Sequence, residues 1–222
     1  MSTLTLHATP PFIDWTMPDW TPTTANSSAP EASPDEENVR LMLLVKQGDV
    51  RAFEQLVELH QRAVIGTVAR MLNNVEDAHD VAQQVFVRVW RSAPRYEPSA
   101  KFTTWLFTIM RNLVFNEMRR RTRKREVSME EQQEEHHREH AASSRSNPDA
   151  SAEQSELEAA IDRAIQTLPE KQRLAVTLRR DADMPYEDIC EILSMSLSAV
   201  KSLLFRARND LKEKLKGYLE VE

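Results

Sequence analysis

The stretch YEDICEILSMSLSAVKSLLFRAR, Tyr186–Arg208, decides the fold of the second half of the chain. Its first part carries apolar residues at helical spacing, Ser194–Ser196 forms a short turn, and Ser196 can cap a second helix. Two short helices with such a turn, the second rich in bases, indicate a helix-turn-helix, which places its second helix in the major groove of DNA. The alternative is an ordinary helical hairpin with a solvated basic face. The residues that we expect to face outward are Ser198, Lys201, Ser202, Phe205, Arg206 and Arg208.

The composition of the whole chain favours an all-α fold. Only three glycines occur in 222 residues, too few for Gly-rich phosphate loops or for a sheet with many tight turns. The abundant residues include Leu, Ala, Glu, Arg and Gln, which are good helix formers. We therefore expect an all-α fold, which the charge and turn signals described below divide into two small helical domains joined by a flexible acidic linker.

Charge is sorted along the sequence. The formal net charge of −6 argues, taken whole, against a nucleic-acid partner. Residues 101–126, however, hold eight bases against two acids, and residues 201–216 hold six bases against two acids. Residues 130–158 hold nine acids against two bases. Two basic patches separated by an acidic tract indicate nucleic-acid contact, with an insulating or mimicking segment between them.

Helix and turn signals divide the chain into four parts. Residues 1–33 are rich in Pro, Thr, Ser and Ala, and we expect them to be disordered. Residues 34–126 form a first module, 127–155 an acidic linker and 156–218 a second module. The signals at helix ends are Ser33 with Pro34, Gly48-Asp49, Asn73-Asn74, and Pro94 with Pro98. The expected helices are 34–47, 50–72, 75–92 and 104–125, then 156–167, 170–180, 185–193 and 197–216.

The single cysteine and the absence of apolar runs indicate a cytoplasmic protein. Cys190 alone excludes an internal disulfide and a multi-cysteine metal site, and it fits a reducing cytosol. No signal-peptide pattern or membrane-spanning stretch occurs, so we expect no membrane insertion. No nucleophile–base pair, phosphate loop or metal-ligand set supports an enzyme, and we expect no cofactor.

Motifs in both modules point to one family. The first module contains DVAQQVFVRVW at Asp80–Trp90, FTTWL at Phe102–Leu106 and RNL at Arg111–Leu113. The second contains LPEKQR at Leu168–Arg173, Tyr186–Leu193, Val200–Ser202 and Arg206–Arg208. In this order and separation they closely resemble the second and fourth domains of bacterial sigma factors of the extracytoplasmic-function class. The resemblance covers about 35–125 and 156–216.

The resemblance implies a promoter-specificity factor that binds core RNA polymerase and helps to melt the -10 element. The helix at Asp80–Trp90 would dock on the clamp helices of the polymerase β′ subunit, with Val85 and Val89 turned inward, and the β flap would be a further contact. The acidic linker would thread the polymerase cleft toward the RNA path. An anti-sigma factor is a further implied partner. The polar contacts of the docking helix would be Asp80, Gln83, Gln84 and Arg88.

The resemblance also assigns DNA contacts. The loop at 94–102 and the helix that follows it would capture a flipped base of the opened -10 element, and the run Arg119–Lys124 would track phosphates. The helix at 197–212 would read the -35 element as duplex. The implied -10 residues are Lys101, Phe102, Asn112, Arg119, Arg120 and Arg123. The implied -35 residues are Ser198, Lys201, Ser202, Phe205 and Arg206.

The chain departs from the family pattern in the helix-turn-helix. Gly is usual where Ser194 stands, Gly-Thr is usual at Ser198-Ala199, and an Arg is usual at Leu203. We therefore expect an altered -35 preference and an unchanged fold.

Several residues keep two interpretations. Trp105 lies among aromatics and bases that suit unpaired DNA, but we favour a core position for it. Cys190 could be a redox sensor, although a small core residue is favoured. A solvated cluster is favoured over a metal site for His136, His137 and His140. The repeat of Asp-Trp-Thr at 14–16 and 19–21 is either chance or a docking motif.

Rival functions make different predictions. A free-standing repressor or activator would bind duplex DNA tightly without polymerase, usually as a dimer, and would leave the first module unexplained. A decoy that occupies polymerase without reading DNA would be indifferent to charge reversal at Lys201 and Arg206.

Overall fold

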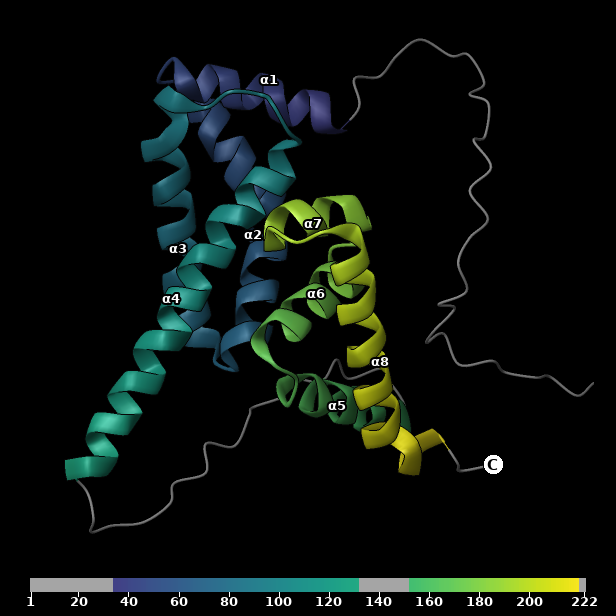
Figure 1. The fold of residues 1–222 in the computed structure, drawn as a ribbon. Helices are drawn as coiled ribbons and strands as arrows, with labels where there is room; N and C mark the ends of the chain where they lie inside the picture. Colours follow the sequence, from purple (N-terminus) through teal and green to yellow (C-terminus); the bar gives the residue numbers. More distant parts are fainter. Residues whose placement is uncertain (1–33, 132–151, 220–222) are drawn as a thin grey trace, which may run out of the picture. The chain divides into compact units, whose positions relative to one another are not determined.

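The computed structural model describes residues 34–131 and 152–219, and every regular element in these two ranges is a helix (Figure 1). The all-α prediction is confirmed. The first module contains α1 (Pro34–Lys46), α2 (Val50–Leu72), α3 (Val75–Ser92), the short 3-10 helix η1 (Ala93–Arg95) and α4 (Phe102–Glu131). The second contains α5 (Ala152–Gln166), α6 (Glu170–Asp181), α7 (Tyr186–Leu193) and α8 (Leu197–Leu219). The expected cap Ser33 and the repeat at 14–21 lie outside the described residues.

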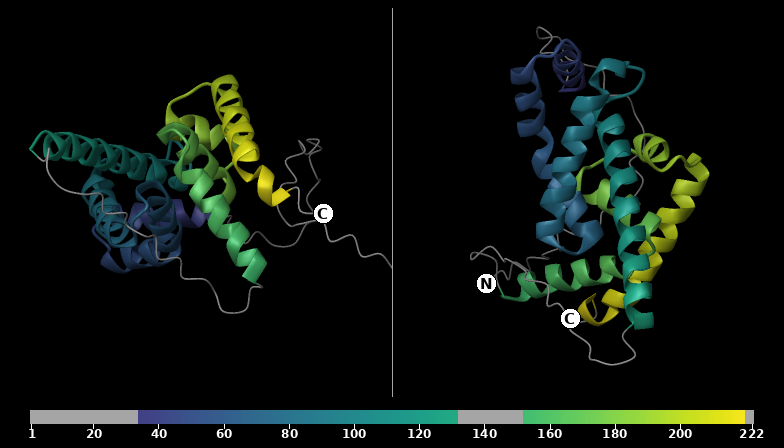
Figure 2. Two further views of the ribbon diagram at one scale, coloured as in Figure 1. Left: turned by 90° about the horizontal axis from the view of Figure 1, so that it is seen from below. Right: turned by 90° about the vertical axis from the view of Figure 1, so that its left-hand side faces the viewer.

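Helices α4 and α5 extend beyond their predicted ends. Helix α4 begins at Phe102 and continues to Glu131, past the predicted end at Arg125, and α5 begins at Ala152. Residues 126–131 contain neither Gly nor Pro, so nothing in the sequence stops the helix there. The last turns of α4 extend past the ends of α2 and α3 in both figures (Figure 1, Figure 2).

The predicted caps connect the first three helices. Asp49 caps α2, because its Oδ1 accepts a hydrogen bond of 3.0 Å from the backbone N–H of Ala52. Gly48 before it has φ +92°, a conformation that favours glycine. Asn73 ends α2 in the left-handed region, and Asn74 Oδ1 caps α3 by accepting from the N–H of Asp77 at 3.2 Å. These signals fix the two tight connections that set α2 between α1 and α3.

Each module has an apolar core built at helical spacing. In the first, α2 packs against α1, α3 and α4. In the second, α8 packs against α5, α6 and α7. The fully buried side chains at the centre of the first core include Met42, Leu56, Val64, Val68, Val85, Leu106, Met110 and Val114. Those of the second include Ile165, Leu174, Leu178, Ile189, Ile192 and Val200.

The segment between η1 and α4 is held by contacts with α1. Lys46 Nζ at the end of α1 donates to the carbonyl oxygen of Tyr96 at 2.8 Å. At its other end, Asp35 Oδ1 accepts from the backbone N–H of Phe102 at 3.2 Å, which caps the first turn of α4. Helix α1 therefore positions the loop that precedes Lys101.

Candidate functional site

The outward face of α3 carries a row of exposed polar residues. Val81, Val85 and Val89 point into the core, as predicted for the last two. The side chains between them, at helical spacing, lie on the solvent side. All four predicted polymerase-contact residues are exposed there, namely Asp80, Gln83, Gln84 and Arg88.

An apolar groove of about 580 Å³ runs between α2 and α3 beside this row. Its walls include Phe53 from α2 and Val87 and Trp90 from α3, and Gln83 lies on its edge. Phe53 and Trp90 pack edge to face with ring centroids 5.1 Å apart. Exposed apolar side chains gathered in a groove mark an interaction surface. The spacing of apolar residues within one helix could not predict this groove, because its lining residues come from two helices.

The start of α4 corrects one prediction. Phe102 is only 1% exposed, and its ring packs against His60 at 5.3 Å and Trp105 at 5.9 Å between centroids. Its side chain therefore cannot stack on an unpaired base in this conformation. The first turn of a helix that packs on α1 and α2 turns Phe102 inward, and a spacing pattern alone could not tell the two faces apart. Trp105 is half-buried in the same aromatic cluster, 5.0 Å from Tyr96.

Polar residues on either side of this cluster remain at the surface. Lys101 and Asn112 are exposed. Arg111 donates to Asn112 Oδ1 at 2.8 Å and also to Ser194 Oγ at 3.2 Å. Lys101 Nζ forms an ion pair with Asp188 at 3.0 Å, and this hydrogen bond raises the pKa of Lys101.

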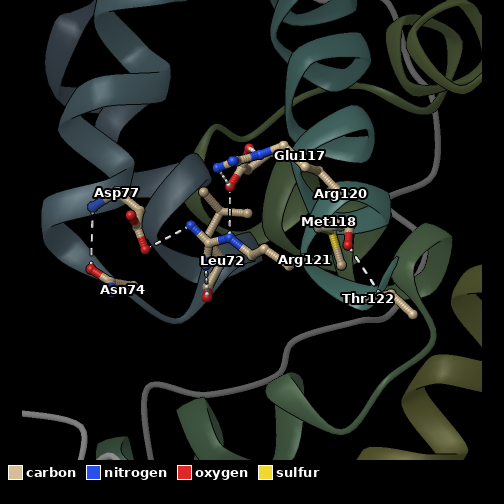
Figure 3. A network of polar contacts seen from close by, with 8 residues as sticks. All are labelled: Leu72, Asn74, Asp77, Glu117, Met118, Arg120, Arg121 and Thr122. Atoms are coloured by element: carbon tan, nitrogen blue, oxygen red, sulfur yellow. Dashed lines mark hydrogen bonds and ion pairs between the residues drawn. The ribbon is translucent and has the colours of Figure 1, made fainter. Parts of the chain in front are cut away.

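The basic run of α4 divides into a structural part around Arg121, drawn in Figure 3, and an exposed part. Arg121 pairs with Asp77 at 2.6 Å and with Glu117 at 2.9 Å, and it donates weakly to the carbonyl of Leu72 at 3.4 Å. It thereby ties α4 to the α2–α3 turn. Its two arginine neighbours hold Glu117 ionised, and the hydrogen bond from Arg120 is the first cause of its lowered pKa.

The three predicted phosphate-contact residues of this run lie at the surface. Arg119 and Arg123 are exposed, and Arg119 is held by Asn116 at 2.6 Å. Arg120 is exposed but is paired with Glu117 at 2.8 Å. The sequence gives no signal that distinguishes Arg121 from these neighbours.

The helix-turn-helix has the predicted geometry, except that Arg208, expected to face outward, is half-buried because its side chain lies at the edge of the packed face of α8. Val200, Leu204 and Ala207 of α8 are buried, and Ser196 Oγ accepts from the N–H of Ala199 at 3.3 Å. Phe205, 60% exposed, is an apolar side chain presented to solvent on a basic helix. Arg206 donates to Ser202 Oγ at 3.0 Å. The five predicted -35 residues are all exposed, namely Ser198, Lys201, Ser202, Phe205 and Arg206.

The backbone conformation of the turn shows why glycine is usual at the position of Ser194. Ser194 ends α7 with φ +54° and ψ 51°, the left-handed conformation in which glycine carries no steric penalty. Its backbone N–H donates to the carbonyl of Glu191 at 3.1 Å. A serine therefore preserves the turn at a cost of about 1 kcal/mol.

The minor candidate sites receive little support. Cys190 is half-buried on α7, and burial raises the pKa of its thiol, which disfavours the reactive thiolate. His136, His137 and His140 lie outside the described residues, and within those residues no cluster of three or more metal-ligating side chains occurs. Among the helices that the structure describes, none is long and apolar enough to cross a membrane.

The comparisons with known proteins agree with this arrangement. Residues 56–124 match the Sigma-70 region 2 family, and residues 158–211 match the Sigma-70, region 4 family. The RNA polymerase sigma-H factor of Pseudomonas aeruginosa is 32% identical over 186 residues, which cover 83% of this chain and 96% of that protein. The ECF RNA polymerase sigma-E factor of Escherichia coli K12 is 31% identical over 173 residues, 77% of this chain and 90% of the relative.

Two solved structures share the fold. The sigma factor RpoE from Bartonella quintana, solved with the anti-sigma factor NepR, is 28% identical with a TM-score of 0.59, and the match covers 75% of this chain and 98% of that one. CnrH, solved with the cytosolic domain of CnrY, matches at 22% identity and a TM-score of 0.60 over 82% of this chain and 98% of the other. With both conserved regions in order and relatives matched over nearly their whole length, the chain belongs to the extracytoplasmic-function class of the sigma-70 family of RNA polymerase sigma factors.

Proposed function

We infer that the protein is a promoter-specificity factor, which binds core RNA polymerase, directs it to particular promoters and helps to melt the -10 element. The observation that carries this function is the presence of two separate recognition surfaces on one chain. The exposed face of α3 suits a protein partner, and the exposed basic face of α8 suits duplex DNA. Members of this family are initiation factors, so the protein acts by binding and not by catalysis.

The proposed polymerase surface combines the polar row of α3 with the groove beside it. The row would contact the clamp helices of the β′ subunit, and the β flap would meet the second module. Trp90 and Phe53 supply the aromatic contact area that is enriched in the energetic centre of protein interfaces. The row consists of Asp80, Gln83, Gln84 and Arg88.

The proposed -10 surface lies at the start of α4 and along its basic run. An open hollow that adjoins the loop at Pro98–Ala100 is lined in part by Asp35 and Glu36 of α1, so the proposal rests on the exposed polar residues beside it. Lys101 and Asn112 would contact the nucleotide, and Phe102 becomes a positioning residue for the loop. Arg119, Arg120 and Arg123 would contact phosphates.

The proposed -35 surface is the outer face of α8. A helix fits the major groove, where Lys201 and Arg206 can reach bases and phosphates. The exposed ring of Phe205 suits contact with a thymine methyl group. Ser198 and Ser202 complete the face.

The wider organisation is also proposed on family grounds. The division into 34–126, a linker at 127–155 and 156–218 follows the two conserved regions, and the linker would follow the polymerase cleft. A partner that masks these surfaces, an anti-sigma factor, fits a chain of this class. The site of action would be the cytoplasm.

The first experiment measures binding of the full-length protein to core RNA polymerase, followed by transcription from the DNA upstream of its own gene. The double variant Gln84→Ala with Arg88→Ala removes two exposed side chains and should weaken binding at least tenfold. Glu58→Ala, an exposed change on α2, is the matched control. Nanomolar binding to duplex DNA without binding to core polymerase would instead establish a free-standing regulator.

A further inference from the structure

The loop that precedes α4 begins and ends in one aromatic cluster. Tyr96 comes before residues 97–101 and Phe102 comes after them, and both side chains are almost fully buried. Their ring centroids lie 6.4 Å apart, and both rings also pack on Trp105. The residues between these two anchors are exposed or half-buried, so the loop leaves the core and returns to it at the same cluster.

Helix α1 bonds to the backbone of both anchors, and the loop runs along it before α4 begins (Figure 1). Near the end of α1, Lys46 Nζ donates to the carbonyl oxygen of Tyr96 at 2.8 Å. In its first turn, Asp35 Oδ1 accepts from the backbone N–H of Phe102 at 3.2 Å. Each bond has one charged partner, and such bonds are stronger than neutral ones. One helix therefore fixes the backbone at both ends of the loop.

The middle of α1 supports the second anchor through a side chain of α2. Asn38 is only 6% exposed, and its Oδ1 lies 2.9 Å from Nε2 of His60. The His60 ring packs on that of Phe102. Val39 lines the same open hollow as the loop residues Pro98–Ala100. The contact of α1 with this region is thus continuous along the helix and is not limited to its two ends.

The loop itself contains little regular structure. The backbone N–H of Ser99 donates to the carbonyl of Glu97 at 2.8 Å, which makes a turn of three residues, and Pro98 between them restricts the backbone. A loop of this kind keeps its conformation chiefly through its ends. Ordering a flexible segment during binding costs conformational entropy, and a segment already held in its bound conformation avoids that cost.

The charge of Asp35 makes its role testable. The hydrogen bond with Asp188 is the first cause of the raised pKa of Lys101, and the charge of Asp35 adds to it, so this carboxylate lies close to the proposed -10 surface. A carboxylate near that surface repels DNA phosphates. Its removal should therefore tighten DNA binding if charge is its only effect, and should weaken binding if Asp35 positions the loop.

We propose that α1 is a positioning element for recognition of the -10 element, in which Asp35 and Lys46 hold the two ends of the loop at 97–101 in the conformation that binds the opened strand. The proposal rests on the proposed function, and both residues act through the loop and not by touching DNA. The proposed polymerase row lies on the outer face of α3, whose principal packing partners are α2, α4 and η1. Affinity for core polymerase should therefore not depend on these two residues.

The test measures how tightly the complex of full-length protein and core polymerase binds single-stranded DNA that spans the -10 element of its own promoter, with a scrambled strand as reference. Asp35→Ala removes the acceptor for the Phe102 N–H and should weaken binding to the -10 strand about three- to tenfold, although it removes a negative charge. Asp35→Asn keeps an oxygen acceptor and should bind at least as tightly as wild type. Tighter binding by Asp35→Ala would overturn the proposal.

The other end of the loop needs a different measurement, because Lys46 carries a positive charge. Lys46→Met keeps the aliphatic chain and should weaken binding by a similar factor, with the slope of log affinity against log salt unchanged. A slope reduced by about one would make Lys46 a phosphate contact and would overturn its positioning role. Glu37→Ala is the matched control for Asp35, because Glu37 lies in the same turn and pairs with Arg40. This control should not weaken binding.

Hydrogen exchange reports the position of the loop without DNA. The amide of Phe102 should be protected in wild type and in Asp35→Asn, and should exchange about tenfold faster in Asp35→Ala. Tyr96→Phe removes a buried hydroxyl that has no hydrogen-bond partner among the described residues and keeps the ring, so it should retain both protection and affinity. Equal protection in Asp35→Ala and wild type would overturn the proposal.

The outcomes separate this proposal from the function on which it rests. If the wild-type complex binds its own -10 strand no better than the scrambled one, the proposed function fails. If wild type discriminates and both Asp35→Ala and Lys46→Met discriminate equally well, the positioning role is refuted and the function stands. A loss of affinity for core polymerase by the same factor would trace the effect to general unfolding and would also refute it.

Discussion

Arg121 and Arg123 lie two residues apart on α4, and replacing each by Ala should affect a different property. Arg121→Ala should lower the stability of the protein, and Arg123→Ala should weaken DNA binding. Arg121 is about one-third exposed and holds Asp77, Glu117 and a backbone carbonyl. Each partly exposed ion pair contributes about 0.2–1 kcal/mol, and the long carbonyl contact adds little. Arg121→Ala should therefore lower the free energy of unfolding by about 1–2 kcal/mol. Arg123 is exposed, so Arg123→Ala should change it by less than about 0.5 kcal/mol.

Urea unfolding followed by far-UV circular dichroism measures the free energy of unfolding of both variants. The slope with denaturant should be the same in both variants, because neither changes the surface exposed on unfolding. Promoter binding by the assembled polymerase complex measures the contribution of Arg123 to DNA binding. Arg123→Ala should weaken it and reduce the slope of log affinity against log salt by about one, as expected for one lost phosphate contact.

Either of two results would refute the reasoning. Equal loss of stability in both variants would mean that the network in Figure 3 does not distinguish Arg121 from its neighbours. An unchanged salt dependence for Arg123→Ala would remove that residue from the phosphate contacts. A double-mutant cycle of Arg121→Ala with Asp77→Ala isolates the pair, and its coupling energy should be positive but below about 1 kcal/mol.

Three further predictions concern other surfaces. Burial lowers the pKa of His60 below its usual 6.5, so its contribution to stability is present above pH 6.5 and is lost as the pH falls. Urea unfolding of the wild-type protein should therefore show a loss of up to about 1.4 kcal/mol at pH 5.5, and His60→Gln should abolish this loss. An identical pH profile in the variant would contradict the prediction. Val85→Ala should destabilise the protein by about 2 kcal/mol, because its side chain is fully buried on the inner side of α3, and a thermal midpoint within 1 °C of wild type would count against that packing. Phe205→Ala should leave the thermal midpoint unchanged, because the ring is exposed, and should weaken duplex binding to the -35 element; unchanged duplex affinity would exclude Phe205 from the DNA contacts.

The sequence was sufficient to predict the bounds of the first three helices, because local signals determine them, whereas α4 and α5 extend beyond their predicted ends. Gly48, Asp49, Asn73 and Asn74 mark both tight connections of the first module, and each has the backbone geometry or cap bond that its residue type favours. The inward positions of Val85 and Val89 followed from helical spacing and are confirmed.

Contacts between distant helices could not be predicted in the same way. Phe102 belongs to a motif that suits DNA as well as a core, and only its packing on His60 decides between them. Arg121 has the same side chain as Arg120, and its role depends on the distance to Asp77 across a turn. The ion pairs of Arg70 with Asp162 and Asp181 could not be predicted from the sequence, because these partners lie 92 and 111 residues away.

The uninterrupted helix α4 fixes the distance between the two ends of the proposed -10 surface. Lys101 immediately precedes the helix and Arg123 lies 22 residues further on, which corresponds to a rise of about 33 Å. Because no Gly or Pro interrupts α4 between them, the two positions cannot shift relative to each other. One residue inserted in this stretch would turn the end that carries Arg123 by about 100° relative to Lys101, and would misalign the two ends of the proposed -10 surface.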